Sequence, residues 1–188
     1  MLRPETLLIS ISLFKYIMKI VYSFILFLFF SHFLFAQNDK NNISNEVEVI
    51  GLVEKPMKIN MESVKKMKWV ERKDFKITGL DGTVKRKIAN FKGVLLKSIL
   101  EEARIKLENP KDRGKYFVLI TATDGYQVIF SYNELMYSVA SDNTYLVFEE
   151  EGKEIDKEGK FVIICASDII SGPRHVKWLK TIEVKRVD

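Results

Sequence analysis

The sequence is poor in the residues from which metal sites and nucleophilic centres are built. Its 188 residues include one cysteine, Cys165, and two histidines, His32 and His175. One cysteine cannot form a disulfide within the chain, and a structural zinc site needs several Cys or His ligands. No Asp-rich loop with the alternation of a calcium site is present. The chemistry therefore has to come from cations, carboxylates, backbone dipoles or a cofactor.

The amino-terminal residues have the layout of a secretory signal peptide. Lys19 precedes an uncharged apolar stretch over residues 20–30, and the small residue Ala36 precedes a polar stretch. We therefore expect residues 1–36 to be a cleaved signal peptide, with Met18 as an alternative start, and the protein to be exported, periplasmic or extracellular. An uncleaved membrane anchor is the alternative, because the stretch nearly reaches the roughly 18 to 20 residues of a span. The lack of a cationic cluster after Ala36 favours cleavage.

Charge is nearly balanced in the part that would remain after cleavage. The whole chain has 30 basic and 25 acidic side chains. Residues 1–36 hold three of the cations and one of the acids, so 27 and 24 remain. This balance does not indicate a nucleic-acid partner, and we expect contact with a membrane only through an uncleaved signal segment. The remaining 152 residues are enough for one domain with its own core.

Short runs of alternating polarity, separated by turn signals, predict many strands and few helices. Residues 37–45 are polar and Asn-rich, which is typical of a linker, and residues 46–188 form the predicted domain. The predicted strands are 46–53, 69–78, 83–91, 115–123, 126–130, 144–149, 161–165 and 176–185. Helices are expected from Asn60 to about Met67, over 94–104, and after Ser131 with Glu134 in a capping box. The expected class is α+β, mostly β.

The stretch from residue 171 to residue 184 is the most informative part of the chain. It begins with a turn at Gly172 and Pro173. Three basic side chains follow: Arg174, His175 and Lys177. Backbone N–H groups of a Gly turn beside paired cations favour a bound phosphate. Arg174 and Lys177 would point to opposite faces of a regular strand, so this interpretation requires the turn to break the alternation. An ordinary solvated surface is the alternative, and Pro173 removes one N–H.

Four stretches, in this order, resemble the sulfite-oxidase-type oxidoreductase molybdopterin-binding domain family. They are Gly51–Pro56, Phe91–Leu100, Thr123–Ser131 and Arg174–Trp178, and together they extend over nearly all of residues 46–186. The resemblance implies layered small sheets with short helices and a groove for a pterin cofactor. It implies molybdopterin as the candidate cofactor, with its phosphate at Gly172, Arg174, His175 and Lys177 and Tyr126 as a wall residue. No haem motif is present, so an electron carrier would be a separate protein.

One feature of the family is missing from this sequence. Family enzymes hold molybdenum through a cysteine thiolate that precedes the aromatic-Gly-Val stretch, and residues 70–90 contain no cysteine. Cys165 lies in an apolar run, which predicts a buried small hydrophobe. We therefore predict no catalytic or metal-binding residue, and whether the protein is an enzyme stays open.

A second basic cluster, Lys85-Arg86-Lys87, is predicted to be a solvated hairpin edge.

Two functions are consistent with the sequence observations. One is an exported pterin-phosphate binding domain within a redox system. The other is a non-catalytic periplasmic binding or interaction module that reuses the fold without a cofactor.

Overall fold

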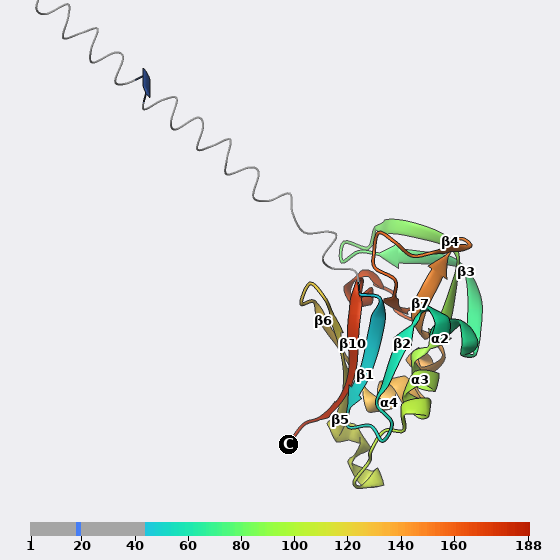
Figure 1. Cartoon of the computed structure of the whole chain (residues 1–188), viewed down its shortest axis with the longest axis vertical. Coiled ribbons are helices and arrows are strands. Elements are labelled where there is room, and N and C mark those ends of the chain that lie inside the picture. Colours follow the sequence, from blue (N-terminus) through green and yellow to red (C-terminus); the bar gives the residue numbers. More distant parts are fainter. Residues whose placement is uncertain (1–17, 20–43) are drawn as a thin grey trace, which may run out of the picture. The chain divides into compact units, whose positions relative to one another are not determined.

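Ten strands and a few short helices make up residues 44–188 (Figure 1). The structure, a computed structural model, describes these residues together with Met18 and Lys19. The strands are β1 (Glu46–Gly51), β2 (Met57–Asn60), β3 (Trp69–Thr78), β4 (Val84–Leu95), β5 (Tyr116–Ala122), β6 (Gln127–Ser131), β7 (Thr144–Glu150), β8 (Lys153–Glu154), β9 (Val162–Cys165) and β10 (Leu179–Arg186). The α-helices are α2 (Met61–Lys66), α3 (Leu96–Ala103) and α4 (Tyr132–Tyr137), and the 3-10 helices are η2 (Pro110–Lys115), η3 (Val139–Asp142) and η4 (Gly172–Arg174).

These strands form two five-stranded sheets. The first sheet has the order β2-β1-β10-β5-β6. The second has the order β3-β4-β7-β8, and β9 also pairs with β7. Strands β1 and β10 are parallel, and the other named pairs are antiparallel. The architecture confirms the predicted α+β class with a majority of β-structure.

The predicted signal peptide and linker lie outside the described residues, apart from Met18, Lys19, Ser44 and Asn45, and they stay predictions. Within the described part of the chain, no helix has the length and apolar character needed to cross a membrane.

Two helices begin at the predicted capping residues. Asn60 Oδ1 accepts a hydrogen bond from Ser63 N, and Ser63 Oγ accepts one from Asn60 N, both at 2.9 Å. Ser131 Oγ accepts from Glu134 N at 3.1 Å, as predicted, but the Glu134 carboxylate pairs with Arg174, so the predicted capping box is not completed. These bonds satisfy amide groups that the first turn of a helix leaves without a partner.

Several elements differ from the predictions. The short strands β2 and β8 are not among the predicted strands, and β1 ends at Gly51, two residues earlier than predicted. Strand β4 continues to Leu95, because Gly93, Val94 and Leu95 pair with β7, and the helix that follows starts later than expected. Strand β10 starts at Leu179, because Trp178 has a φ of 48° and interrupts the strand. Val176 forms only an isolated bridge to Ile163.

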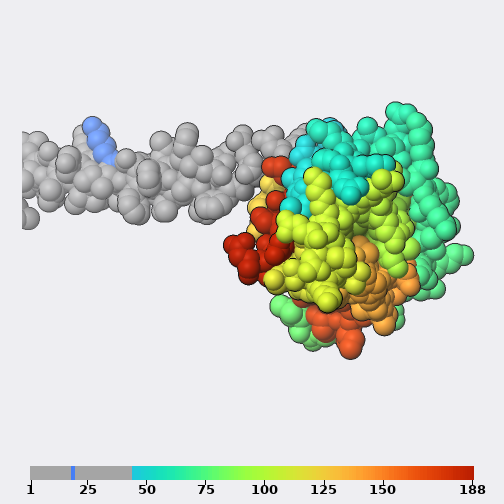
Figure 2. Space-filling view, turned by 90° about the horizontal axis from the view of Figure 1, so that it is seen from below, coloured from blue at the N-terminus to red at the C-terminus, as the bar shows by residue number. Residues whose placement is uncertain are grey.

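The larger hydrophobic cluster includes buried residues from both sheets and from all three α-helices. Figure 2 shows that α3 and the segment through η2, in green to yellow-green, occupy the middle of the face seen from below. A smaller cluster packs on the second sheet and includes Ile77, Phe91, Tyr145 and Ile155. Six of the seven residues of β7 are buried, which is expected of a strand with a cluster on each face.

Candidate functional site

The Gly-Pro turn is held between the two sheets by short polar contacts. Tyr126 Oη donates a hydrogen bond to Pro173 O at 2.6 Å. Ser171 Oγ accepts from Thr78 N at 3.0 Å, which ties the turn to the end of β3. A Cβ at Gly172 would lie 2.8 Å from Thr78 O, so only glycine allows this approach of two backbones. The turn is therefore a fixed structural element of the candidate site.

Arg174 is paired with two carboxylates. Its guanidinium forms a bidentate pair with Asp168, in which Nε donates to Oδ2 at 2.7 Å, and a further ion pair with Glu134. The same guanidinium lies over the Phe130 ring, 4.5 Å from its centroid, and Nη2 is 3.6 Å from Cys165 Sγ. The hydrogen bonds to Asp168 raise the pKa of Arg174 above its usual value, against the effect of burial. The positive charge of Arg174 is thus balanced within the protein.

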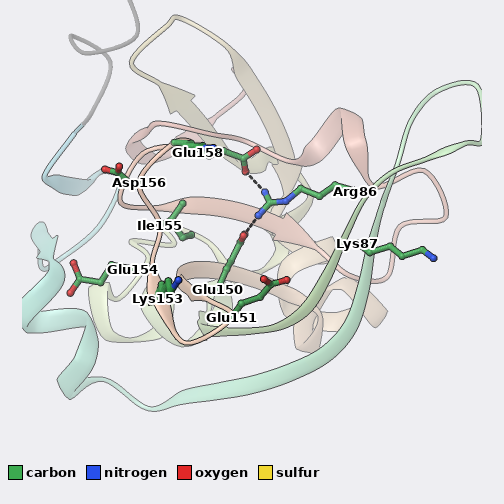
Figure 3. A pocket seen from close by; sticks show the side chains of 10 residues that line it. Arg86, Lys87, Glu150, Glu151, Lys153, Glu154, Ile155, Asp156 and Glu158 are labelled. Carbon is green, nitrogen blue, oxygen red and sulfur yellow. Dashed lines mark hydrogen bonds and ion pairs between the residues drawn. The ribbon is translucent and has the colours of Figure 1, made fainter.

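His175 and Lys177 both lie against Glu158. Lys177 Nζ is 2.7 Å from Glu158 Oε1, and His175 Nε2 is 3.3 Å from Glu158 Oε2. His175 Nε2 is buried and makes no hydrogen bond with the described residues. It is close to the Glu158 carboxylate without being hydrogen-bonded to it. Arg86 Nη1 reaches the same carboxylate at 2.7 Å (Figure 3). Glu158 therefore contacts three basic side chains, which come from two separate parts of the chain.

Arg86 also pairs with Glu150, and the pKa values of the two glutamates shift in opposite directions. Burial is the largest effect on the pKa of Glu150 and raises it, although Arg86 opposes the shift. Burial would also raise the pKa of Glu158, but the contacts of His175 and Lys177 and the charge of Arg86 lower it to about 2. Glu150 Oε1 is buried and has no hydrogen-bond partner among the described residues. Glu158 is thus the firmly ionised member of the cluster.

A polar cavity of about 680 Å³ opens beside this cluster (Figure 3). Its lining has five carboxylates, four cations and one apolar side chain: Glu150, Glu151, Glu154, Asp156, Glu158, Arg86, Lys87, Lys153, Lys157 and Ile155. A net negative lining of this kind does not favour an anionic ligand.

The structure brings some of the predicted site residues together and separates others. His175 and Lys177 share Glu158, whereas Arg174 has the different partners Asp168 and Glu134. Tyr126 and Gly172 support the turn that carries them. The assignment of Gly172, Arg174, His175 and Lys177 to a cofactor phosphate, and of Tyr126 to the wall of the groove, stays a prediction.

The cluster at residues 85–87 differs from the prediction at one position. Lys85 is exposed and pairs with Asp81, and Lys87 is exposed opposite Lys76, as a solvated edge requires. Arg86 instead points into the polar cluster, because neighbouring side chains of a strand alternate between its faces. That alternation could have singled out Arg86 in the sequence.

Asp168 and Glu158 were missed by the sequence analysis. Each lies in a loop that carries no motif, so no local signal identifies either residue.

Cys165 is buried, as predicted, with an exposed fraction of 0%. Its Sγ lies 3.2 Å from Ser167 Oγ, and Thr144 Oγ1 donates to it at 3.5 Å. Within the described ranges, no group of three or more His, Cys, Asp or Glu side chains is arranged to hold a metal ion.

The family model of the oxidoreductase molybdopterin binding domain matches residues 36–188. The chain belongs to this family. Among solved structures, it is similar to the crystal structure of the sulfane dehydrogenase SoxCD from Paracoccus pantotrophus, with 20% identity and a TM-score of 0.56. The match covers 80% of this chain and 40% of that chain, so this protein spans about two fifths of its length. At this identity the likeness shows the fold alone. A search of curated proteins finds no match.

The predicted family and its fold are thereby confirmed, and the described residues can be compared with what the family's cofactor needs. At the Gly-Pro turn, the cations Arg174 and Lys177 are already paired with Asp168 and Glu158. A thiolate ligand to molybdenum would have to come from Cys165, which is fully buried. The buried Cys165 does not fit a molybdenum–thiolate centre.

Proposed function

We propose that this member of the molybdopterin-binding family is an exported, non-catalytic binding or interaction module that uses the fold without the cofactor. The observation that carries the proposal is the internal pairing of the basic turn. Arg174 is paired with Asp168 and Glu134, and Lys177 with Glu158. These carboxylates take the positions beside the cations that a phosphate would otherwise need.

The energetics of the pairs support the same conclusion. Asp168 and Glu158 are both more than four-fifths buried. A phosphate that displaced Asp168 from Arg174 would leave this carboxylate without its counter-ion in a poorly solvated position, whereas Glu158 would still keep Arg86. Breaking a buried pair in this way costs about 3 to 5 kcal/mol, which an exchange of one anion for another does not recover.

A second candidate is the pterin-phosphate binding domain of a redox system that passes electrons to a separate carrier protein. The extent of the family match favours it, since residues 36–188 include the whole Arg174–Trp178 motif. The side chain of Lys177 is also 40% exposed, so an incoming anion could reach its ammonium group.

Cofactor content distinguishes the two candidates. The protein is produced in a host that makes molybdopterin and exports proteins, and its molybdenum and pterin are measured per mole of purified protein. We expect contents far below one mole per mole in the folded wild type. Stoichiometric pterin that is lost in Arg174→Ala/Lys177→Ala, but kept in the matched control Lys180→Ala, would establish the second candidate instead. Lys180 is an exposed cation of the same segment.

Export is tested on the same preparation. Mass spectrometry of the accumulated protein should show a chain that begins after Ala36, recovered from the periplasm or the medium. A chain of full-length mass in the membrane fraction would contradict this part of the proposal and favour an uncleaved anchor.

A further inference from the structure

The open edges of the two sheets differ in how well they are protected against pairing with another strand. Charged side chains, proline and irregular backbone are the usual protection. Pro56 precedes the edge strand β2, which carries Lys58. The edge strand β3 carries Arg72 and Lys73, followed by Asp74 with a φ of 56°. Both edges therefore have features that oppose strand addition.

Strand β6 has none of these features. Its five residues, Gln-Val-Ile-Phe-Ser, include no charge and no proline, and its register with β5 is regular throughout. Gln127, Ile129 and Ser131 are exposed, and the side chain of Ile129 is 59% exposed. Figure 1 shows β6 as the outermost strand of the first sheet.

The backbone of β6 is ready to accept another strand. Ala122 N donates to Tyr126 O at 2.9 Å, which sets the alternation of the antiparallel ladder. Val128 and Phe130 therefore direct their backbone groups toward β5, and Gln127 and Ile129 direct theirs away from it. Among the described residues, β6 pairs with β5 alone. The outward N–H and C=O groups thus form a row that no described strand covers.

We propose that β6 pairs in antiparallel fashion with β6 of a second copy of this chain, so that two first sheets become one continuous sheet. Pairing about a two-fold axis at Ile129 places Ile129 opposite its symmetry mate and Gln127 opposite Ser131. Each facing pair of outward residues exchanges two backbone hydrogen bonds. A charge at position 129 would meet its own copy in such a symmetric contact, and Ile129 is uncharged.

The side chains beside the axis also suit a second copy. Leu119 lies opposite Ile129 in the register, and Phe117 lies opposite Ser131. Both are only partly buried and share the outer face with Ile129. The contact is short, so we expect a dimer that forms and dissociates with concentration. This inference concerns a surface separate from the basic turn and does not depend on the proposed function.

Disulfide trapping tests the pairing register. Cα atoms of a hydrogen-bonded antiparallel pair lie about 5.5 Å apart, which a disulfide can span. The natural Cys165 is buried, so Ile129→Cys introduces the one accessible thiol of the described residues. The protein, purified from an exporting host in the form that accumulates, should form covalent dimers at least tenfold faster with Ile129→Cys than with Leu80→Cys. Leu80 is 86% exposed at the tip of the β3–β4 hairpin. Equal rates for the two variants would overturn the proposal.

Sedimentation equilibrium tests the association itself. Ile129→Lys places two ammonium groups opposite each other at the axis, so the dimer dissociation constant should rise at least tenfold, while Leu80→Lys should leave it unchanged. Circular dichroism verifies that both variants are folded, and Ile129→Gln replaces the lysine variant if that one is not. A wild type that stays monomeric at millimolar concentration, or a dimer that tolerates Ile129→Lys, would show that β6 is not the contact.

Discussion

At the scale of single residues, Glu150 and Glu158 contact the same guanidinium, yet their pKa values shift in opposite directions. Both are largely buried, and burial alone disfavours the charged form of a carboxyl group. Glu158 has Lys177 and His175 as additional partners, whereas Glu150 has one oxygen without any partner. The number of basic neighbours therefore decides which glutamate stays ionised.

This difference predicts how stability responds to acid. The pKa of Glu158 in the folded protein is about 2, below its usual value of 4.5. The stabilisation that ionised Glu158 adds to the folded state is therefore complete above about pH 5 and is lost as the pH falls toward 2. The loss is about 3 kcal/mol in the free energy of unfolding. The raised pKa of Glu150 acts with the opposite sign, since its protonated form is favoured in the folded state.

Urea unfolding of the wild type and of Glu158→Gln from pH 5 to pH 2 measures this contribution. The difference in unfolding free energy between the two proteins should shrink as the pH falls. A constant difference across this range would mean that the pKa of Glu158 is not lowered.

At the scale of elements, the Gly-Pro turn depends on its close contact with the end of β3. Gly172 and Gly114 offer a matched pair of substitutions. A Cβ at Gly172 would lie 2.8 Å from Thr78 O, whereas the nearest atom to a Cβ at Gly114 is 3.9 Å away. Overpacking against a backbone atom typically costs about 1 to 3 kcal/mol. We expect Gly172→Ala to lose stability in this range and Gly114→Ala to be nearly neutral in thermal unfolding.

The same contact has a local consequence. Ser171 and Thr78 should lose their hydrogen bond in Gly172→Ala, so amide exchange at Thr78 should accelerate while exchange within β5 stays slow. Equal stability of the two alanine variants would show that the turn can move away from β3 without cost.

At the scale of the whole molecule, one hydrophobic cluster joins both sheets, and Cys165 is part of it. The thiol can therefore react only when the core opens. We expect the free energy obtained from thiol protection to equal the free energy of global unfolding within about 1 kcal/mol. Labelling of the wild type in increasing denaturant measures it, and Leu80→Cys supplies a thiol that should react at once. Rapid labelling of Cys165 in native buffer would contradict a single cooperative core.

Sequence patterns were sufficient for most elements because their signals are local. Alternating polarity located β1, a largely apolar run located β5, and the Asp-Gly turn at residues 124–125 preceded β6. The capping residues Asn60 and Ser131 marked two helix starts. The patterns did not give the end of β4, because residues 93–95 stay extended through pairing with β7, which is distant in sequence. The sequence patterns also did not predict the start of β10, because it depends on the left-handed backbone of Trp178.

The sequence by itself determined the family, the mostly β architecture, the basic turn and the burial of its one cysteine. Each of these follows from residue types at short spacing. Only the tertiary structure decided what the basic residues contact, because Asp168, Glu134 and Glu158 come from loops and elements that no local pattern connects to the turn. Electrostatic pairing depends on distance in space, and that distance is set by the packing of the two sheets.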